Sequence, residues 1–397
     1  MRHKSFSNTV IDKGEIEQSL LNVDNRTRSN LFSWNGQFSP QFVETLIKKY
    51  TLPEYRILDP FLGSGTTLYE CAQLNLDVTG VELNPSAFHI AKIYELCNKP
   101  LQIRNDLINQ VKHIIENNSV NILSCLNMFY EKDLMTVLSL LIIMMDGNTN
   151  IEQLYRLWGK LSSIIADFPF CTQRVQAYNG DARDLDFNDD SFDLVFTSPP
   201  YINVYNYHQQ YRKAVEKLGY NVLLTATAEI GSNRKNRKNR FYTVIQYCID
   251  IALAIREIVR VTKGNKRIIL IVGRCSKVLG IDFFNSKLVY DIITKIFDLT
   301  LIIRQERFFQ NRYGETIYED ILHFRNNKKN SVLDEGVIKN AARKIAQSYF
   351  EQIIATCAES ETQLLLQDAI SCINHIRESS FYIAKNKQTS DVELISM

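Results

Sequence analysis

The sequence has no closely spaced pair of cysteines. Its eight cysteines are scattered along 397 residues, and no C-x-x-C pair occurs among them. A zinc ribbon needs such pairs, so this class of metal-binding fold is excluded, and we expect no metal site. Cysteines spread in this way are typical of reduced, mostly buried thiols in a cytoplasmic protein.

Long apolar segments are also missing. The most apolar run, 134-LMTVLSLLIIMM-145, has twelve residues and is closed by Asp146. It is too short to cross a bilayer and suits a buried helix. The N-terminal residues 1–20 lack the apolar core of a signal peptide. We therefore expect a cytoplasmic protein without a membrane partner.

The chain carries no large excess of either charge. Its 46 basic and 44 acidic residues give a net charge of +2, so a polyanionic partner must be bound by a local patch. The low-complexity stretch 231-GSNRKNRKNR-240 contains five basic residues and no acidic residue. In a loop it would bind DNA phosphates, unless it is only a solvated surface loop. Its asparagines at every third position, 233, 236 and 239, are further candidates for such contacts. The basic residues are Arg234, Lys235, Arg237, Lys238 and Arg240.

Composition and periodicity indicate an α/β protein. Hydrophobic residues make up 45% and charged residues 23% of the chain, as in ordinary soluble globular proteins. Short apolar runs alternate with longer segments of helical period, which predicts a sheet covered by helices. The turn-like stretch 310-QNRYGE-315 predicts that the last two strands are antiparallel. Strands are expected at 56–60, 77–83, 175–181, 192–199, 267–273, 299–309 and 316–324, and helices at 40–50, 66–75, 86–98, 203–218, 241–262 and 285–297.

The first expected strand is followed by a glycine-containing turn, 59-DPFLGSGTT-67. Gly63 and Gly65 allow a tight strand-to-helix turn and close approach of a ligand to the backbone. Thr66 and Thr67 are expected to cap the helix that follows. The lysine of a phosphate-binding P-loop is absent, so hydrolysis of nucleoside triphosphates is disfavoured.

Carboxylates occur at the ends of three successive expected strands. Glu82 is placed to accept both hydroxyls of a ribose, and Asp181 to accept the amino group of an adenine. Asp59, beside the glycine turn, suits an ammonium group. The three together fit S-adenosylmethionine better than a dinucleotide, because they would repel a pyrophosphate.

Four motifs together resemble the amino-methylating DNA methyltransferases, which modify the exocyclic nitrogen of cytosine or adenine. They are LDPFLGSGTT, GVELNP, GDARDL and TSPPY, and the resemblance extends from residue 34 to 327 apart from a helical insertion. It implies a seven-stranded, mostly parallel Rossmann-like methyltransferase sheet with an antiparallel last strand. Here the glycine turn precedes TSPPY, whereas many serine-type relatives have the reverse order. The residues implied to bind the cofactor are Asp59, Pro60, Phe61, Gly63, Gly65, Thr66, Glu82, Asp181 and Ala182, with Asn35 lining the methionine part.

The TSPPY motif supplies the groups that methylation of an amino nitrogen needs. The lone pair of such a nitrogen is delocalised, so acceptors must hold its hydrogens while the electrophile lies in line. The Ser198 hydroxyl and the Pro199 carbonyl are the expected acceptors, or the hydroxyl holds the ring nitrogen of the base. The Pro199–Pro200 pair fixes the backbone. Tyr201 is the expected stacking partner of a flipped-out base.

The resemblance also favours one base, since serine before the two prolines is typical of cytosine N4 methylation. Methylation at cytosine C5 needs a thiolate after a proline, and the chain has no Pro-Cys pair. The aromatic residues that follow TSPPY either contact the base and phosphates or pack at helical spacing. They are Tyr205, Tyr207, His208 and Tyr211.

The resemblance and the helical pattern together divide the chain into four parts. Residues 1–98 would be the cofactor-loop part of the methyltransferase domain, and residues 175–330 its catalytic part. Residues 99–174 show helical spacing and are either a target-recognition region or a structural cap. Residues 331–397 are expected to form a C-terminal helical appendage of unknown role.

The expected function is methylation of cytosine N4 at specific sites of double-stranded DNA by a prokaryotic enzyme. A restriction-modification system is the expected setting, with a cognate endonuclease acting on the same site. Methylation of adenine N6 in DNA and methylation of an RNA base are alternatives. A DNA-binding regulator on an inactive fold is a further alternative, but it predicts an eroded cofactor loop, and Asp59, Gly63, Gly65 and Glu82 are all present.

Overall fold

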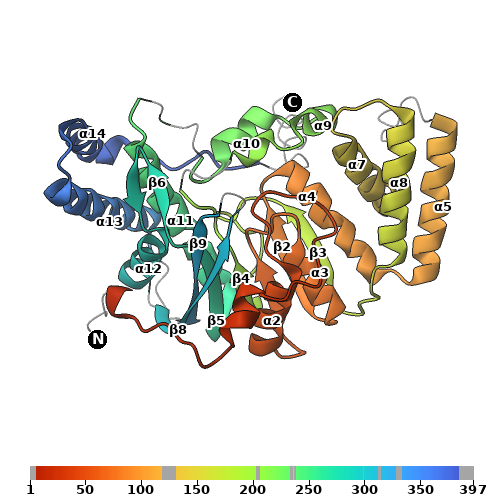
Figure 1. The fold of residues 1–397 in the computed structure, drawn as a ribbon, viewed down its shortest axis with the longest axis horizontal. Coiled ribbons are helices and arrows are strands. Elements are labelled where there is room, and N and C mark those ends of the chain that lie inside the picture. Colours follow the sequence, from red (N-terminus) through yellow and green to blue (C-terminus); the bar gives the residue numbers. More distant parts are fainter. Residues whose placement is uncertain are drawn as a thin grey trace, which may run out of the picture. The chain divides into compact units, whose positions relative to one another are not determined.

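The computed structural model contains a mixed seven-stranded sheet with helices on its faces (Figure 1). It describes residues 6–118, 131–202, 206–232, 236, 238–297, 299–311, 314–327 and 333–383. The strand order is β3-β2-β1-β4-β5-β9-β8. The pairs β1–β2, β2–β3 and β4–β5 are parallel, and β9 is antiparallel to both β5 and β8. The strands are β1 (Arg56–Asp59), β2 (Asp77–Glu82), β3 (Val175–Asn179), β4 (Phe192–Thr197), β5 (Thr262–Gly273), β8 (Leu299–Gln310) and β9 (Thr316–Asn326).

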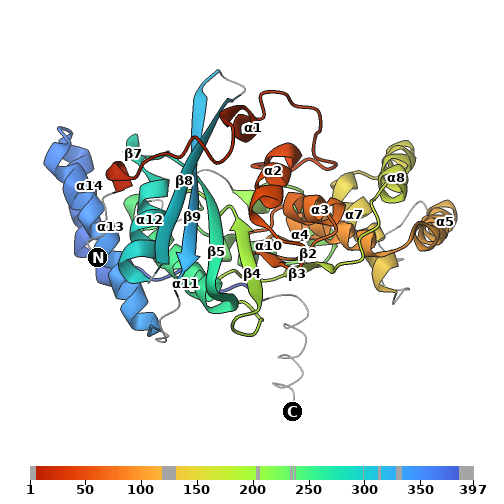
Figure 2. The same cartoon turned by 90° about the horizontal axis from the view of Figure 1, so that it is seen from below.

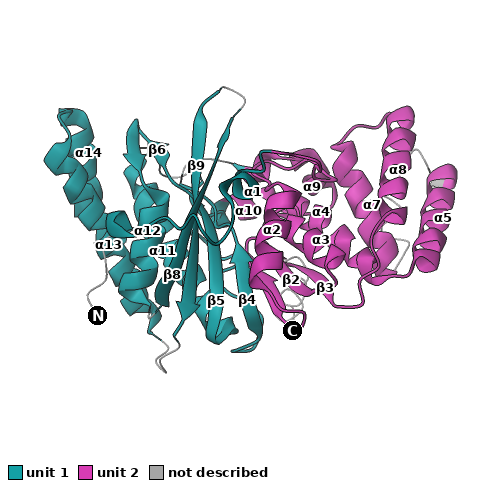
Figure 3. Cartoon of the chain, turned by 60° about the horizontal axis from the view of Figure 1, so that its bottom comes forward, with its two compact units in different colours: residues 1–24, 182–206, 227–381 teal, residues 25–181, 207–226, 382–397 magenta. Residues whose placement is uncertain are grey.

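The chain divides into two compact units, each assembled from separate stretches of sequence (Figure 3). Unit 1 comprises residues 1–24, 182–206 and 227–381, and it holds β4, β5, β8 and β9. Unit 2 comprises residues 25–181, 207–226 and 382–397, and it holds β1, β2 and β3.

Unit 2 builds its strands and helices from apolar residues with clear end signals. Ile57 and Leu58 of β1 are fully buried, as expected for a strand covered on both faces. The Asn84 side chain accepts the Ser86 and Ala87 N–H groups and so begins α4, with Pro85 in its first turn. Its other long helices are α2 (Pro40–Tyr50), α3 (Thr66–Gln73), α4 (Pro85–Lys92), α5 (Leu101–Asn118), α7 (Lys132–Met145) and α8 (Ile151–Ala166).

Unit 1 packs three long helices against a largely buried central one. Helix α11 (Phe241–Val261) contacts α12 (Asn285–Ile296), α13 (Glu335–Thr356) and α14 (Ser360–Ser371), and Figure 2 shows the last two beside each other. The rings of Phe241, Phe283 and Phe350 meet with centroids 5.9–6.2 Å apart. These edge and tilted contacts are typical of aromatic cores.

The predicted fold class is confirmed, including the antiparallel last strand. The helix expected at 203–218 is wrong. Residues 203–205 lie outside the described residues, and a short 3-10 turn (Tyr207–Gln209) precedes α9 (Arg212–Lys217). Tyr211 interrupts the helix because it has a φ of 56°. Helix α10 (Val222–Ala228) and the β6–β7 hairpin (Ser276–Val278 and Ile281–Phe283) were not predicted.

The described cysteines are free, and most of them are buried, as expected. The cysteines at 71, 97, 171 and 248 are buried, and those at 275, 357 and 372 are free thiols with some exposure. Across the described ranges, every helix is too short or too polar to span a membrane. The four-part division of the chain stays a prediction.

Candidate functional site

The glycine turn after β1 is held against β2. The Leu62 N–H donates to the Val81 carbonyl (3.0 Å), and the Gly65 N–H donates to the Leu62 carbonyl (3.1 Å). Gly80 on β2 makes this packing possible, because a Cβ there would lie 2.5 Å from the Leu62 side chain. The turn is therefore a fixed part of the sheet edge in unit 2.

The two glycines of the turn are required for different reasons. Both have a positive φ, 55° at Gly63 and 86° at Gly65, where side chains other than glycine are strained. A Cβ on Gly65 would also lie 2.9 Å from the Ala91 backbone on α4. A Cβ on Gly63 would meet nothing closer than the Trp34 indole nitrogen at 3.9 Å. Gly65 thus serves helix packing, and only Gly63 leaves space beside the backbone for a ligand.

Two of the predicted carboxylates are oriented by this turn. Asp59 is only 4% exposed and accepts the Thr67 hydroxyl (2.7 Å) and the Phe61 N–H (3.2 Å). Glu82 accepts the Gly63 N–H and the Asn84 N–H, one on each oxygen, both at 2.7 Å. These two contacts fix the orientation of the Glu82 carboxylate. The hydroxyls of a ribose and an ammonium group are hydrogen-bond donors, so they suit the two carboxylates Asp59 and Glu82, which are acceptors.

The prediction that Thr66 and Thr67 cap the following helix is wrong. Gly65 is the N-cap of α3, and it makes no side-chain capping bond. The two threonines lie in the first helical turn, one position too late to cap it. Their hydroxyls bond elsewhere, from Thr66 to Asn30 (2.9 Å) and from Thr67 to Asp59 (2.7 Å). Pro60 is buried and Phe61 is half-buried.

The segment with Asn35 lies beside the glycine turn. The Gln37 amide donates to the Ser64 hydroxyl at 2.6 Å, which ties the segment to the turn. The Asn35 side chain is exposed, and its backbone N–H donates to the Gln210 side chain at 3.3 Å. Asn35 is thus near the turn, while its role toward a cofactor stays a prediction.

The aromatic residues after TSPPY are largely packing groups. Trp34 is buried and stacks on Tyr207 (centroids 6.0 Å apart, 11° between planes) and on Tyr211 (6.4 Å, 20°). His208 is buried. Tyr205 lies outside the described residues. The packing alternative therefore holds for the described members of this group.

Asp181 contacts a residue that belongs to none of the predicted motifs. Its carboxylate accepts the Tyr382 N–H at 3.0 Å, across 201 residues of sequence. Tyr382 also donates its hydroxyl to the Asn179 side chain at 2.8 Å. Asp181 and Ala182 are both buried. No spacing or motif could have linked Tyr382 to the end of β3.

The TSPPY corner lies in unit 1 at the end of β4. The Ser198 hydroxyl donates to the Ile271 carbonyl on β5 at 3.0 Å. With its hydrogen used in this way, the Ser198 oxygen presents lone pairs and acts as an acceptor. Pro199 is buried and Pro200 is half-buried, which fixes the backbone on both sides of the Pro199 carbonyl.

Tyr201 is held by groups that the sequence analysis missed. Its hydroxyl donates to Glu319 on β9 at 2.9 Å, and Glu319, 5% exposed, pairs with Arg307 on β8 at 2.5 Å. Burial, reinforced by the Glu319 charge, raises the pKa of Tyr201, so the phenol stays neutral. A Cβ on Gly273 would lie 2.6 Å from the ring. The ring therefore rests on the β5 backbone.

The basic stretch is only partly described. Arg234, Lys235 and Arg237 lie outside the described residues, and Lys238 is exposed. Arg240 is half-buried at the start of α11, and burial lowers its pKa.

The third asparagine of this stretch was wrongly predicted as a DNA contact. Asn239 is 3% exposed and donates to the Leu365 carbonyl (2.7 Å) and to Asp368 (2.9 Å). It therefore joins the loop to α14.

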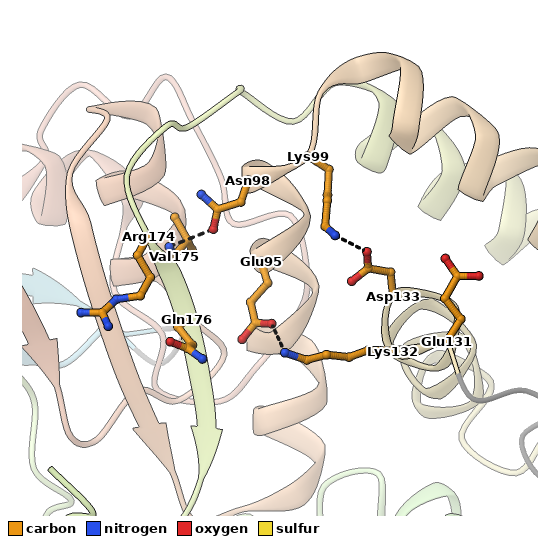
Figure 4. Close-up of a pocket in the computed structure, with 9 residues that line it drawn as sticks. All are labelled: Glu95, Asn98, Lys99, Glu131, Lys132, Asp133, Arg174, Val175 and Gln176. Carbon is orange, nitrogen blue, oxygen red and sulfur yellow. Dashed lines mark hydrogen bonds and ion pairs between the residues drawn. The ribbon is translucent and has the colours of Figure 1, made fainter.

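Unit 2 also contains a cavity of about 490 Å³ (Figure 4). It borders Val175 at the amino end of β3, whereas Asn179 and Asp181 follow its carboxyl end. Its charges neutralise one another, as in the pairs Lys99–Asp133 (2.7 Å) and Lys132–Glu95 (3.4 Å). Among the described residues no group of three His, Cys, Asp or Glu side chains is placed to hold a metal.

Comparison with known proteins finds a family that is similar to the segment containing this turn. Residues 7–93 match the family described as DNA methylase, of the N6 and N4 methyltransferase class. In this segment the chain is similar to the amino-methylating DNA methylases. The match includes the glycine turn and Glu82 and ends before the TSPPY corner.

Two curated relatives share only a short stretch with this chain. The type II methyltransferase M.MjaII of Methanocaldococcus jannaschii is 30% identical over 109 residues, which are 26% of this chain and 20% of that protein. The type II methyltransferase M.AvaI of Nostoc sp. is 25% identical over 118 residues, 28% of this chain and 24% of that protein. The matched stretch thus covers about a fifth to a quarter of these relatives.

Solved structures resemble the chain only in outline. A S-adenosylmethionine-dependent methyltransferase of Methanosarcina mazei aligns with 72% of this chain and 98% of its own, at 13% identity and a TM-score of 0.37. The rRNA methyltransferase AviRa of Streptomyces viridochromogenes aligns with 82% of this chain and 96% of its own, at 12% identity and a TM-score of 0.32. At such scores the likeness carries no argument about function.

Proposed function

We propose that the chain methylates the N4 amino group of cytosine in double-stranded DNA with S-adenosylmethionine as the methyl donor. The DNA methylase match supports this cofactor and reaction class. The serine before the two prolines supports the choice of cytosine, and the Ser198 hydroxyl, whose hydrogen is directed to the Ile271 carbonyl, supports an amino group as the target. Its oxygen is therefore an acceptor for a base amino group.

The fixed corner would prepare the amino nitrogen for attack. The Ser198 oxygen and the Pro199 carbonyl accept its two hydrogens, which draws the nitrogen toward a tetrahedral geometry and localises its lone pair. Tyr201 supports the flipped-out base with its ring. The Glu319 and Arg307 pair keeps that ring in place. A bound S-adenosylmethionine supplies a methyl group activated by the sulfonium, so the protein contributes positioning and electrostatics.

The residues of the glycine turn would hold the cofactor. Glu82 accepts the ribose hydroxyls, and Asp59 interacts with the ammonium group across the turn. The Gly63 backbone allows the ligand to approach, since no protein atom would lie within 3.9 Å of a Cβ there. The two carboxylates and the space beside Gly63 all belong to unit 2.

The setting that we propose is a restriction-modification system in a prokaryotic cytoplasm. Both curated relatives are named type II methyltransferases. A cognate restriction endonuclease acting on the same DNA site would then be a partner of this chain. Lys238 and the other basic residues of 231–240 would bind DNA phosphates.

The test is incubation of the purified chain with double-stranded DNA and S-adenosylmethionine labelled in the methyl group, followed by digestion to nucleosides. Label in N4-methylcytosine is expected. The variant Ser198→Ala should lower the rate about 100-fold, the usual effect of removing one well-placed catalytic group. The control Ser371→Ala, at an exposed serine on α14, should have no effect. Label in N6-methyladenine would refute the cytosine assignment, and no label in DNA would refute the proposed activity.

A further inference from the structure

The segment 379–383 reaches the carboxyl end of β3, where a cofactor carboxylate was predicted. Tyr382 contacts this end twice, through its backbone N–H to Asp181 (3.0 Å) and through its hydroxyl to Asn179 (2.8 Å). These two hydrogen bonds fix both the main chain and the ring of Tyr382. Tyr382 is thus an ordered part of this edge in unit 2.

The same contacts connect Tyr382 to the end of β2. The Asn179 amide, which accepts the Tyr382 hydroxyl, donates to the Glu82 carbonyl (2.8 Å) and to the Leu83 carbonyl (3.1 Å). Burial raises the pKa of Tyr382, with further contributions from Tyr220 and the Glu82 carboxylate. The ring is therefore close to the residue that we assign to the ribose.

The residues before Tyr382 are anchored in unit 1 by a buried charge pair. Arg183 is fully buried and donates to the carbonyls of Ser379 (2.9 Å) and Ser380 (2.7 Å). Its partner Asp250, 2.7 Å away, accepts both the N–H and the hydroxyl of Ser379. The Phe381 ring lies 4.8 Å from the Arg183 guanidinium. Removing the segment would take these hydrogen-bond partners away from two buried charges, Arg183 and Asp250, which is strongly unfavourable.

We propose that Tyr382 is a cofactor-binding residue whose ring contacts the adenosine part of S-adenosylmethionine. This inference rests on the proposed function, which supplies the ligand. Tyr382 is half-buried, so part of its surface is accessible, and purines bind well to aromatic faces. The Tyr382 N–H also orients the Asp181 carboxylate, the group predicted to meet the adenine amino group. Its two hydrogen bonds within unit 2 hold Tyr382 at the side of this site.

Calorimetric titration of the full chain tests this proposal with S-adenosylhomocysteine, adenosine and methionine as separate ligands. The variant Tyr382→Ala should weaken binding of S-adenosylhomocysteine and of adenosine by the same factor, roughly tenfold or more. Binding of methionine should be unchanged. Tyr382→Phe keeps the ring and the N–H, so it should bind nearly as well as the wild type. Tyr178→Ala, which removes an exposed tyrosine from β3, is the matched control.

The outcomes separate this proposal from the proposed function. Unchanged adenosine affinity in Tyr382→Ala would refute the role of Tyr382, and tighter binding would mean that the segment obstructs the site. Neither result would refute the proposed methyltransferase activity. A wild-type chain that binds neither S-adenosylhomocysteine nor adenosine would refute both. If Tyr382→Ala does not fold, Tyr382→Trp provides the test, since a displaced ring should change adenosine affinity and spare methionine affinity.

Discussion

The two glycines of the turn after β1 should respond differently to the same substitution. Gly65→Ala places a methyl group 2.9 Å from the Ala91 backbone and from the Tyr94 ring, at a φ of 86°. Gly63→Ala places it at a φ of 55° with its nearest neighbour, the Trp34 indole, 3.9 Å away. We therefore expect Gly65→Ala to destabilise the fold and Gly63→Ala to affect mainly the ligand.

The expected magnitudes follow from these contacts. A left-handed backbone conformation costs an alanine about 1–2 kcal/mol at either position. The clash at Gly65 adds about 1–3 kcal/mol, the usual cost of overpacking against atoms that cannot move away. Gly65→Ala should therefore lower the free energy of unfolding by roughly 2–5 kcal/mol. Gly63→Ala should lower it by no more than about 2 kcal/mol.

Urea denaturation and calorimetric titration with S-adenosylhomocysteine measure the two effects. Gly65→Ala should shift the unfolding midpoint strongly, and Gly63→Ala should weaken ligand binding while it remains folded. Equal losses of stability would refute the assignment of Gly65 to helix packing. Unchanged ligand affinity in Gly63→Ala would refute the assignment of Gly63 to the cofactor.

Three further predictions concern unit 1. Glu319→Gln removes the charge that faces Arg307 and holds Tyr201. The methylation kcat should therefore fall about tenfold, while cofactor affinity stays unchanged. An unchanged kcat would contradict the role of the Glu319–Arg307 pair. Burial, with the Arg267 charge, lowers the pKa of His323 to about 3 from the ordinary 6.5. As the pH falls through 6.5, the His323 imidazole is therefore protonated in the unfolded chain but not in the folded one. Between pH 7 and pH 5 the free energy of unfolding, measured in urea, should fall by about 2 kcal/mol more in the wild type than in His323→Gln. Equal losses in the two proteins would contradict this prediction. Lys238→Ala should weaken DNA binding about equally for all sequences. The dependence of the DNA affinity on salt concentration should fall by the contribution of about one phosphate contact. A loss of affinity restricted to one sequence would contradict this prediction.

Much of the fold was predictable because its strands are short, apolar and well delimited. The runs that became β1 and β2 are buried on both faces, and a proline and a capping asparagine mark the start of α4. The glycine turn was predictable for the same reason, since a tight strand-to-helix connection restricts the residue types that fit. Helix α10 lacks any comparable signal.

The rest of the candidate site depends on contacts between distant parts of the sequence. Glu319 follows Tyr201 by 118 residues, and Tyr382 follows Asp181 by 201 residues. Side chains of this kind carry no local pattern, because sheet pairing and terminal packing alone bring them to their partners. The errors at Thr66 and Asn239 have the same origin, since both side chains bond to residues that are remote in sequence.

The central claim is that this chain transfers a methyl group to the N4 amino nitrogen of cytosine in DNA. Expression of the chain in a host without such methylation, followed by methylation-sensitive sequencing of the host DNA, reports the base and the sequence together. N4-methylcytosine at one recurring sequence, absent from a host expressing Ser198→Ala, is the predicted result. N6-methyladenine at a recurring sequence, or host DNA without new methylation, would contradict the claim.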